Sequence, residues 1–151
     1  MKLYIASDHA GYLLKRDIID KINSVHFIDL GCDTNKSTDY PDYAHKLCGK
    51  ISGDDRGILI CGSGLGMSMA ANRHSHIRAA LIPPDKNNND GEKSISVIYT
   101  EYSRLHNNAN VLVLPGRFMS FEQAWQCILV FLDTEFEGGR HSRRLDKINK
   151  K

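Results

Sequence analysis

The feature of this 151-residue chain that most constrains its fold is the alternation of short apolar runs with stretches of helical periodicity. The apolar runs lie at residues 3–6, 27–30, 58–61, 79–82 and 111–114. Between them, apolar side chains recur every three or four residues, as at Leu14, Ile18 and Ile22. Continuous apolar runs are typical of strands buried on both faces, and strands that alternate with helices pair in parallel through right-handed crossovers. The sequence therefore predicts an α/β fold, a Rossmann-like three-layer α/β/α sandwich around a mostly parallel five-stranded sheet.

Local signals along the chain support this division. Pro41 stands where the first turn of a helix is expected, and Ser120 with Gln123 has the spacing of a capping box. Residues 83–93 read PPDKNNNDGEK, a polar, turn-rich segment that predicts a surface loop. A lid, an extended interface and no role at all stay open for that loop. The basic segment 138–151 is expected to pack on a partner chain.

The composition excludes several classes of function. With 20 basic and 18 acidic residues, the net charge of +2 predicts neither a nucleic-acid surface nor a polybasic membrane anchor. The length suits a single domain over residues 1–151. The four cysteines show no CxxC pairing, which indicates a reducing, cytoplasmic setting, and polar residues come too early for a secretory leader or a membrane span. His74 and His76 lack a third ligand at metal-site spacing, so no metal site is predicted.

Ligands of parallel sheets bind where the carboxyl ends of the strands open into loops. This rule selects Asp8 and His9 after the first run, residues 61–66 after the third, and Arg117 after the fifth. The glycines of the segment 61–66 can leave backbone N–H groups bare at a helix N-terminus, where an anion or a developing oxyanion is stabilised. The segment does not fit a dinucleotide fingerprint, whose third glycine comes one position later and whose turn follows the first strand.

Cys61 stands at the end of the third run, beside those N–H groups. The positive end of a helix dipole favours the thiolate form of cysteine, which would make Cys61 a usable base. Taken alone, a free cysteine in a buried strand is more often a small apolar residue. Local chemistry therefore leaves both roles open for Cys61.

Other candidate residues also have structural alternatives. Asp8 could cap the helix that follows it, although capping does not explain His9. An isolated histidine such as His106 is more often a boundary residue than a catalyst. Three arginines within residues 140–144 have the density that suits phosphate, and a solvated basic tail explains them equally well.

Taken together, five segments resemble ribose-5-phosphate isomerase B, whose family includes the galactose-6-phosphate isomerase subunits. They are SDHAG at 7–11, DYPDYA at 39–44, ICGSGLGMSMAAN at 60–72, HNNANVL at 106–112 and EGGRH at 137–141. Each segment is weak alone, but five in this order, at loops after predicted strands, form a specific combination that spans nearly the whole chain. The resemblance implies a Rossmann-like homodimer that interconverts D-ribose 5-phosphate and D-ribulose 5-phosphate in the pentose phosphate pathway, without metal or other cofactor.

The resemblance also implies roles for individual residues. Cys61 would carry the proton between C2 and C1 of the sugar through a cis-enediolate, with Ser63 beside it, and His106 would open the furanose ring. The implied substrate-binding residues are Asp8, His9, Tyr43, Gly62, Gly64, Leu65, Gly66, Asn107, Arg117, Arg140 and Arg144. Tyr40 and Tyr43 could each direct a hydroxyl at the sugar, with core packing as the alternative.

The resemblance implies that two kinds of group bind the substrate. The N–H groups of residues 62–66, with Asn107, would stabilise the enediolate oxygen. Arg140 and Arg144 would bind the phosphate with Arg117 as a third cation, although Arg143 beside Arg144 leaves that contact ambiguous. In the family the active site combines residues from two subunits, so a homodimer with shared sites is predicted and a tetramer stays open.

Three rival functions remain at this point. A galactose-6-phosphate or allose-6-phosphate isomerase would share the fold, but the galactose-specific proteins divide the catalytic residues between unlike subunits, whereas Cys61 and His106 occur together here. A catalytically silent domain that binds phospho-sugars would keep the same pocket, although a complete acid–base set argues against it. A nucleotide-binding module is disfavoured because the fingerprint is missing and Asp29 lies inside the second run.

Overall fold

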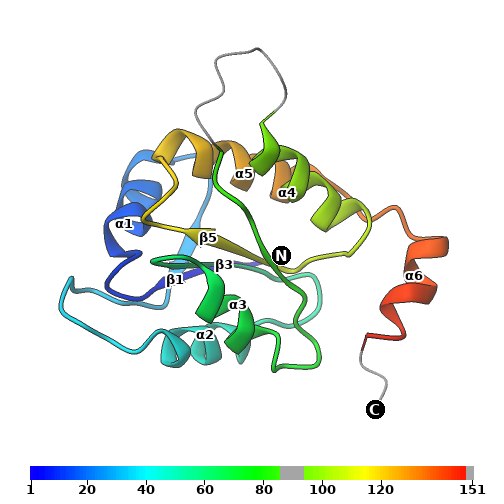
Figure 1. The fold of residues 1–151 in the computed structure, drawn as a ribbon, viewed down its shortest axis with the longest axis horizontal. Coiled ribbons are helices and arrows are strands. Elements are labelled where there is room, and N and C mark those ends of the chain that lie inside the picture. The colour runs from blue at the N-terminus through cyan, green and yellow to red at the C-terminus, as the bar shows by residue number, and fades with distance from the viewer. Residues whose placement is uncertain (86–93, 149–151) are drawn as a thin grey trace.

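The computed structural model describes residues 1–85 and 94–148, and in this part of the chain five strands form one parallel sheet (Figure 1). The strands are β1 (Leu3–Ser7), β2 (Phe27–Asp29), β3 (Arg56–Cys61), β4 (Ala79–Leu81) and β5 (Val111–Pro115). Their order across the sheet is β2-β1-β3-β5-β4. All four neighbouring pairs are parallel, with Ser7 opposite Ile60 and Cys61 opposite Pro115 at the carboxyl ends.

Helices cover both faces of the sheet (Figure 1). They are α1 (Tyr12–Lys21), α2 (Tyr40–Cys48), α3 (Leu65–Ala71), α4 (Ile95–Leu105), α5 (Phe121–Asp133) and α6 (Arg140–Leu145). Helices α1, α4 and α5 lie on one face, and α2 and α3 lie on the other. An apolar core lies between the sheet and each of the two helical layers. Leu14 and Ile128 pack against one face of the sheet, and Ala44 and Met67 pack against the other. Helix α6 stands apart from both layers, at the right of Figure 1.

The predicted fold class is confirmed, since the sheet is wholly parallel and lies between helical layers. Pro41 occupies the first turn of α2, and Ser120 and Gln123 form the expected capping box at the start of α5. Strands β1, β3 and β5 are almost completely buried, as their apolar runs predicted. Strands β2 and β4 are only partly buried, because each lies at an edge of the sheet and has one strand neighbour.

The predicted loop at residues 83–93 lies mostly outside the described residues, which resume at Ser94. Within the described ranges, no helix combines the length and apolar character needed to cross a membrane.

Candidate active site

The loops that follow β1, β3 and β5 meet at the carboxyl edge of the sheet. The Asp8 N–H donates to the Ile60 carbonyl (3.2 Å), and the Gly116 N–H donates to the Cys61 carbonyl (2.8 Å). Gly11 lies so close to β3 that a Cβ atom there would come within 2.4 Å of the Ile60 oxygen. These contacts fix the loops that follow β1 and β5 against the end of β3.

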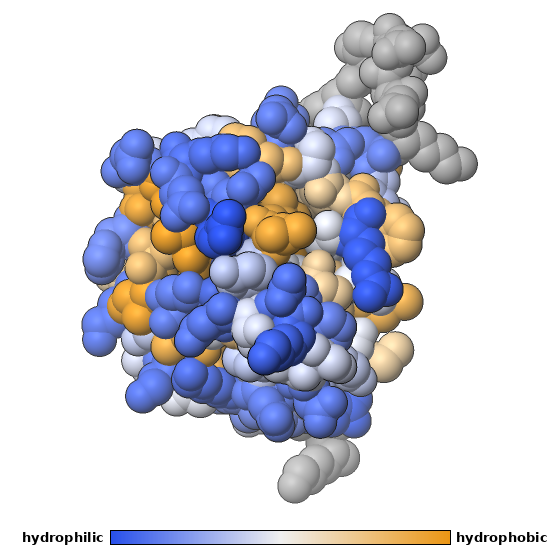
Figure 2. Space-filling view, turned by 90° about the vertical axis from the view of Figure 1, so that its left-hand side faces the viewer, coloured by the Kyte–Doolittle hydropathy of each residue, from blue (hydrophilic) through white to orange (hydrophobic). Residues whose placement is uncertain are grey.

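A cavity of about 290 Å³ opens between these loops. It is lined by Asp8, His9, Ala10, Tyr40, Cys61, Gly62, Ser63, Gly66, Arg117 and Phe118. Figure 2 looks onto this end of the molecule, where apolar surface (orange) lies among hydrophilic side chains (blue). The size of the cavity and its mixed polar and apolar lining suit a small polar ligand.

Cys61 is the last residue of β3, and its side chain is at once buried and part of the cavity wall. The N–H of Gly64 donates to the Cys61 sulfur (3.2 Å) across the tight turn into α3, in which Gly64 has a φ of 75°. This hydrogen bond fixes the sulfur at the mouth of the turn, beside the cavity. Among the other cysteines, burial raises the pKa of Cys48 to about 11 and also raises the pKa of Cys127, so both stay protonated.

Asp8 and His9 have different structural roles. The Asp8 carboxylate accepts the N–H groups of Ala10 (2.9 Å) and Gly11 (3.0 Å), and so shapes the turn that leads into α1. His9 is held by Thr38 through two hydrogen bonds of 3.2 Å. The backbone N–H of His9 donates to the Thr38 hydroxyl, and the ring nitrogen Nδ1 of His9 accepts the backbone N–H of Thr38. Because Nδ1 is an acceptor, a neutral His9 ring carries its proton on Nε2 and can donate it to a ligand.

Two glycines allow long side chains to reach the cavity. The Arg117 guanidinium lies against Gly62, where a Cβ atom would be 3.3 Å from its Cζ. The Tyr40 ring lies against Gly66, where a Cβ atom would be 2.5 Å from Cζ of the ring. The cavity therefore combines a thiol, a fixed histidine and a guanidinium, a set that suits proton transfer on an anionic molecule.

Six of the predicted substrate-binding residues are not among those lining this cavity: Tyr43, Gly64, Leu65, Asn107, Arg140 and Arg144. Tyr43 packs with the core on the α2–α3 side of the sheet and lies against Gly31. The Leu65 side chain is exposed at the start of α3, and a Cβ atom on Gly64 would face Leu81. Tyr40, weighed beside Tyr43 from the same motif, is the tyrosine in the cavity wall.

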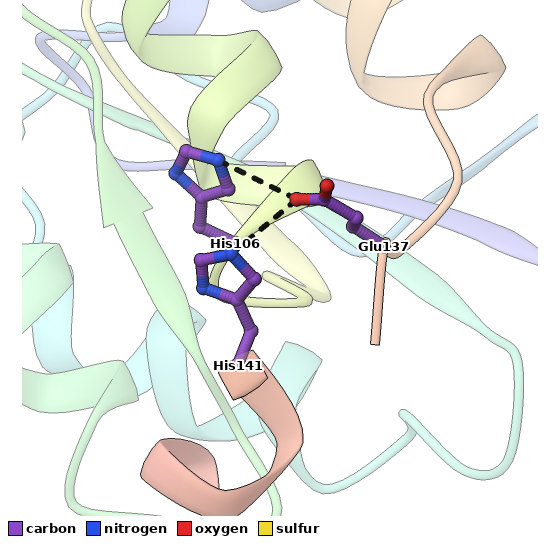
Figure 3. Close-up of side chains that lie close together, drawn as sticks. All are labelled: His106, Glu137 and His141. Atoms are coloured by element: carbon purple, nitrogen blue, oxygen red, sulfur yellow. Dashed lines mark ion pairs between the residues drawn. The ribbon is translucent and has the colours of Figure 1, made fainter. Parts of the chain in front are cut away.

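A second group of predicted residues gathers elsewhere, around the end of α4 and the start of α6. His106 follows α4, and its ring is stacked between those of Tyr102 (centroids 4.8 Å apart) and His141 (4.4 Å). Glu137 Oε2 lies 3.3 Å from His141 Nε2 and 3.8 Å from His106 Nε2 (Figure 3). Arg140 begins α6 beside them, with Nε 3.4 Å from His141 Nε2. The sequence predicted roles for His106 and Arg140, whereas Glu137 and His141, which lie in the same quoted segment 137–141, were given none.

The two groups lie at opposite ends of the sheet. Cys61 is opposite Pro115 at the carboxyl end of β5, whereas His106 precedes Val111 at the amino end of that strand. A strand rises by about 3.3 Å per residue, so the length of β5 alone separates the groups by about 13 Å. One copy of the chain therefore does not bring His106, Asn107 and the arginines of α6 to the cavity that contains Cys61.

His106, Glu137 and His141 are also the one set of three potential metal ligands that lie close together among residues 1–85 and 94–148. The two imidazole planes are within 9° of parallel, and they are stacked. A histidine nitrogen binds a metal in the plane of its own ring, so stacked rings do not direct their nitrogens at one shared point. The arrangement suits a carboxylate oxygen at the edges of two rings better than a bound metal.

Comparisons with known proteins agree with the fold. A family described as Ribose/Galactose Isomerase matches residues 3–148. A putative sugar phosphate isomerase of Rickettsia conorii is 43% identical, over 98% of this chain and 99% of its own length. A crystal structure of a ribose 5-phosphate isomerase from Thermotoga maritima is similar with a TM-score of 0.86 and 43% identity, covering 98% of this chain and 97% of that one. Ribose-5-phosphate isomerase B of Mycoplasma genitalium with bound ribulose-5-phosphate has a TM-score of 0.79 and 38% identity, covering 97% and 93%.

Proposed function

Because the chain belongs to the ribose/galactose isomerase family and is a sugar phosphate isomerase, we propose that it interconverts D-ribose 5-phosphate and D-ribulose 5-phosphate. The observation that carries the proposal is the cavity in which the Cys61 sulfur faces the Gly64 N–H beside Arg117. The pentose is favoured over a six-carbon sugar because a structural relative holds ribulose-5-phosphate.

Cys61 is the base of the reaction. Its thiolate removes the proton from C2 of the open-chain aldose, and the C2–H electrons form the C1–C2 double bond of a cis-enediolate. The thiol then returns the proton to C1 with the electrons of the C1–C2 double bond, while the proton of O2 passes to the negative O1, so that O2 becomes the carbonyl oxygen and O1 the hydroxyl of the ketose. The negative oxygen at C1 is stabilised by backbone N–H groups of residues 62–66 and by the Ser63 hydroxyl, which line or adjoin the cavity.

A second copy of the chain completes each site. His106 opens the furanose ring, Asn107 contributes to binding the enediolate, and Arg140 with Arg144 binds the phosphate together with Arg117. Apart from Arg117, these residues lie at the amino end of the sheet in their own chain, because His106 follows α4 and precedes Val111 of β5, and α6 lies beside His106. A homodimer in which residues 138–151 pack on the partner would bring the two ends together, and further pairing to a tetramer is compatible with it.

The single domain of residues 1–151 works without a cofactor in this proposal, since Cys61 and His106 supply the acid–base chemistry. The cytoplasm is the proposed location, because the cysteines are free and buried and so fit a reducing compartment.

Replacing Cys61 by alanine tests the proposed base. The purified chain, assayed with EDTA present for ketose formation from ribose 5-phosphate, should be active, and Cys61→Ala should lose at least about a hundredfold in kcat because general base catalysis is gone. Cys48→Ala is the matched control, since Cys48 is buried away from the cavity. Full activity in Cys61→Ala would overturn the mechanism. Activity only on a six-carbon sugar phosphate would overturn the pentose assignment but leave the chemistry in place.

A further inference from the structure

Glu137 occupies a distinctive position in the group around His106. Its carboxylate oxygen Oε2 faces Nε2 of both His106 and His141, and the two rings are stacked on each other (Figure 3). The Tyr102 ring covers the other face of His106. His106 is therefore confined between two rings, and one carboxylate lies at the edge from which Nε2 points.

The surroundings of His141 favour its neutral form. Burial, then the neighbouring His106 and Arg140, lower the pKa of His141, so that His141 is neutral at pH 7. Arg144 acts in the same direction, and Glu137 opposes them. Glu137 Oε2 lies 3.8 Å from His106 Nε2, and a carboxylate in that position orients the ring and is attracted to it whenever it takes up a proton.

We propose that Glu137 is a positioning residue for ring opening, which holds the proton-bearing Nε2 of His106 and stabilises its imidazolium form. This role rests on the proposed function. In ring opening, the bond from C1 to the ring oxygen breaks and its electron pair stays on that oxygen, which takes a proton from Nδ1 of the His106 imidazolium. The C1 hydroxyl loses its proton to water as the aldehyde forms. Glu137 touches no substrate atom and acts through His106.

Ring opening can be separated from proton transfer between carbons by the choice of substrate. Ribulose 5-phosphate cannot close to a furanose, because its C5 oxygen carries the phosphate. In D₂O, exchange of its C1 proton therefore needs Cys61 but no ring chemistry. The variant to measure is Glu137→Gln, which keeps the size of the side chain and removes its charge. Glu137 is 58% exposed, so the variant should fold normally.

We expect Glu137→Gln to lower kcat for ribose 5-phosphate by at least about tenfold, while C1 deuterium incorporation into ribulose 5-phosphate, followed by NMR, stays within about twofold of the wild type. Glu135→Gln is the matched control, since Glu135 is exposed two residues earlier. An equal loss in both reactions would show a merely structural role, and no loss in either would show no role; both results overturn the proposal. His106→Ala and Cys61→Ala, measured alongside, report separately on the proposed function. If the proposed function holds, His106→Ala loses only the reaction of ribose 5-phosphate, and Cys61→Ala loses that reaction and the C1 exchange of ribulose 5-phosphate.

Discussion

The absence of a side chain at Gly11 sets the distance between two of the loops that form the cavity. A Cβ atom at this position would lie 2.4 Å from the Ile60 carbonyl oxygen and 2.6 Å from its carbon, both backbone atoms of β3 that cannot move aside. Gly11→Ala should therefore destabilise the fold by about 1–3 kcal/mol, and reduce activity by displacing His9 from Cys61. Urea unfolding followed by circular dichroism measures the first effect.

Gly49→Ala provides the matched control for Gly11→Ala. Gly49 has a φ of −69°, and an added Cβ would meet its nearest neighbour, the His45 oxygen, at an ordinary 3.4 Å. This substitution should change the free energy of unfolding by no more than about 0.5 kcal/mol. Equal stability of the two variants would contradict the close contact between Gly11 and β3.

At the level of single residues, the sequence predicted which loops carry chemistry better than which side chains point inward. Tyr40 and Tyr43 are three residues apart and so lie close on one helix face. Only contacts with distant glycines separate them, since the Tyr40 ring lies on Gly66 and the Tyr43 ring on Gly31. In the same way, Glu137 meets His106 because the chain after α5 passes the end of α4, with the Glu137 N–H donating to the Leu105 carbonyl. Periodicity and motifs contain no information about such contacts.

The start of helix α4 depends on Asp85, which precedes the loop joining β4 to that helix. Its carboxylate accepts the Ser96 N–H (3.0 Å), the Ser96 hydroxyl (2.8 Å) and the Ser94 hydroxyl, and Ser94 is the N-cap. Burial alone would raise the pKa of Asp85, but hydrogen bonds from Ser94 and Ser96 hold it below its usual value. Folding therefore favours the ionised form, and this stabilisation is present above the unfolded pKa and is lost as the pH falls through the lower, folded value.

Asp85→Asn should lower the free energy of unfolding at pH 7 by about 1 kcal/mol, because this carboxylate is only partly shielded from water. The difference between wild type and variant should shrink as the pH is lowered below about 4, where the unfolded aspartate becomes protonated. Urea unfolding at several pH values measures this difference. Asp20→Asn, at an exposed site on α1, should show no comparable pH dependence. A difference that is constant with pH would contradict the role given to ionised Asp85.

At the level of elements, the apolar runs located all five strands to within one or two residues at each end. They did not distinguish the buried central strands from β2 and β4, which lie at the edges of the sheet and are only partly covered. The order β2-β1-β3-β5-β4 depends on which strands pair, and each short run is equally able to pair with any other. Burial of edge strands therefore could not be predicted from composition.

The whole molecule carries its candidate residues at two ends of one sheet. Cys61 ends β3 and Arg117 follows β5, so both lie at the carboxyl end of the sheet. A residue that follows α4 and precedes β5, such as His106, must lie at the amino end. The rule that ligands bind at the carboxyl ends of strands selected residues of the first group, and most of these line the cavity. The second group came from resemblance alone, because that rule concerns a single chain and takes no account of a second copy.

A mixed dimer tests whether two chains share each active site. Co-expression of Cys61→Ala and His106→Ala chains with different tags, and purification on both tags, yields dimers with one chain of each kind. If His106 of one chain serves Cys61 of the other, each mixed dimer contains one site with both residues intact and one site with both replaced. Such a dimer should then have about half the wild-type activity, although each variant alone is inactive. Cys61→Ala co-expressed with Cys61→Ser is the control, because every site then lacks the thiol. If each site used residues of one chain, both sites would be damaged and the mixed dimer would stay inactive. A purely monomeric chain in light scattering would contradict the shared site directly.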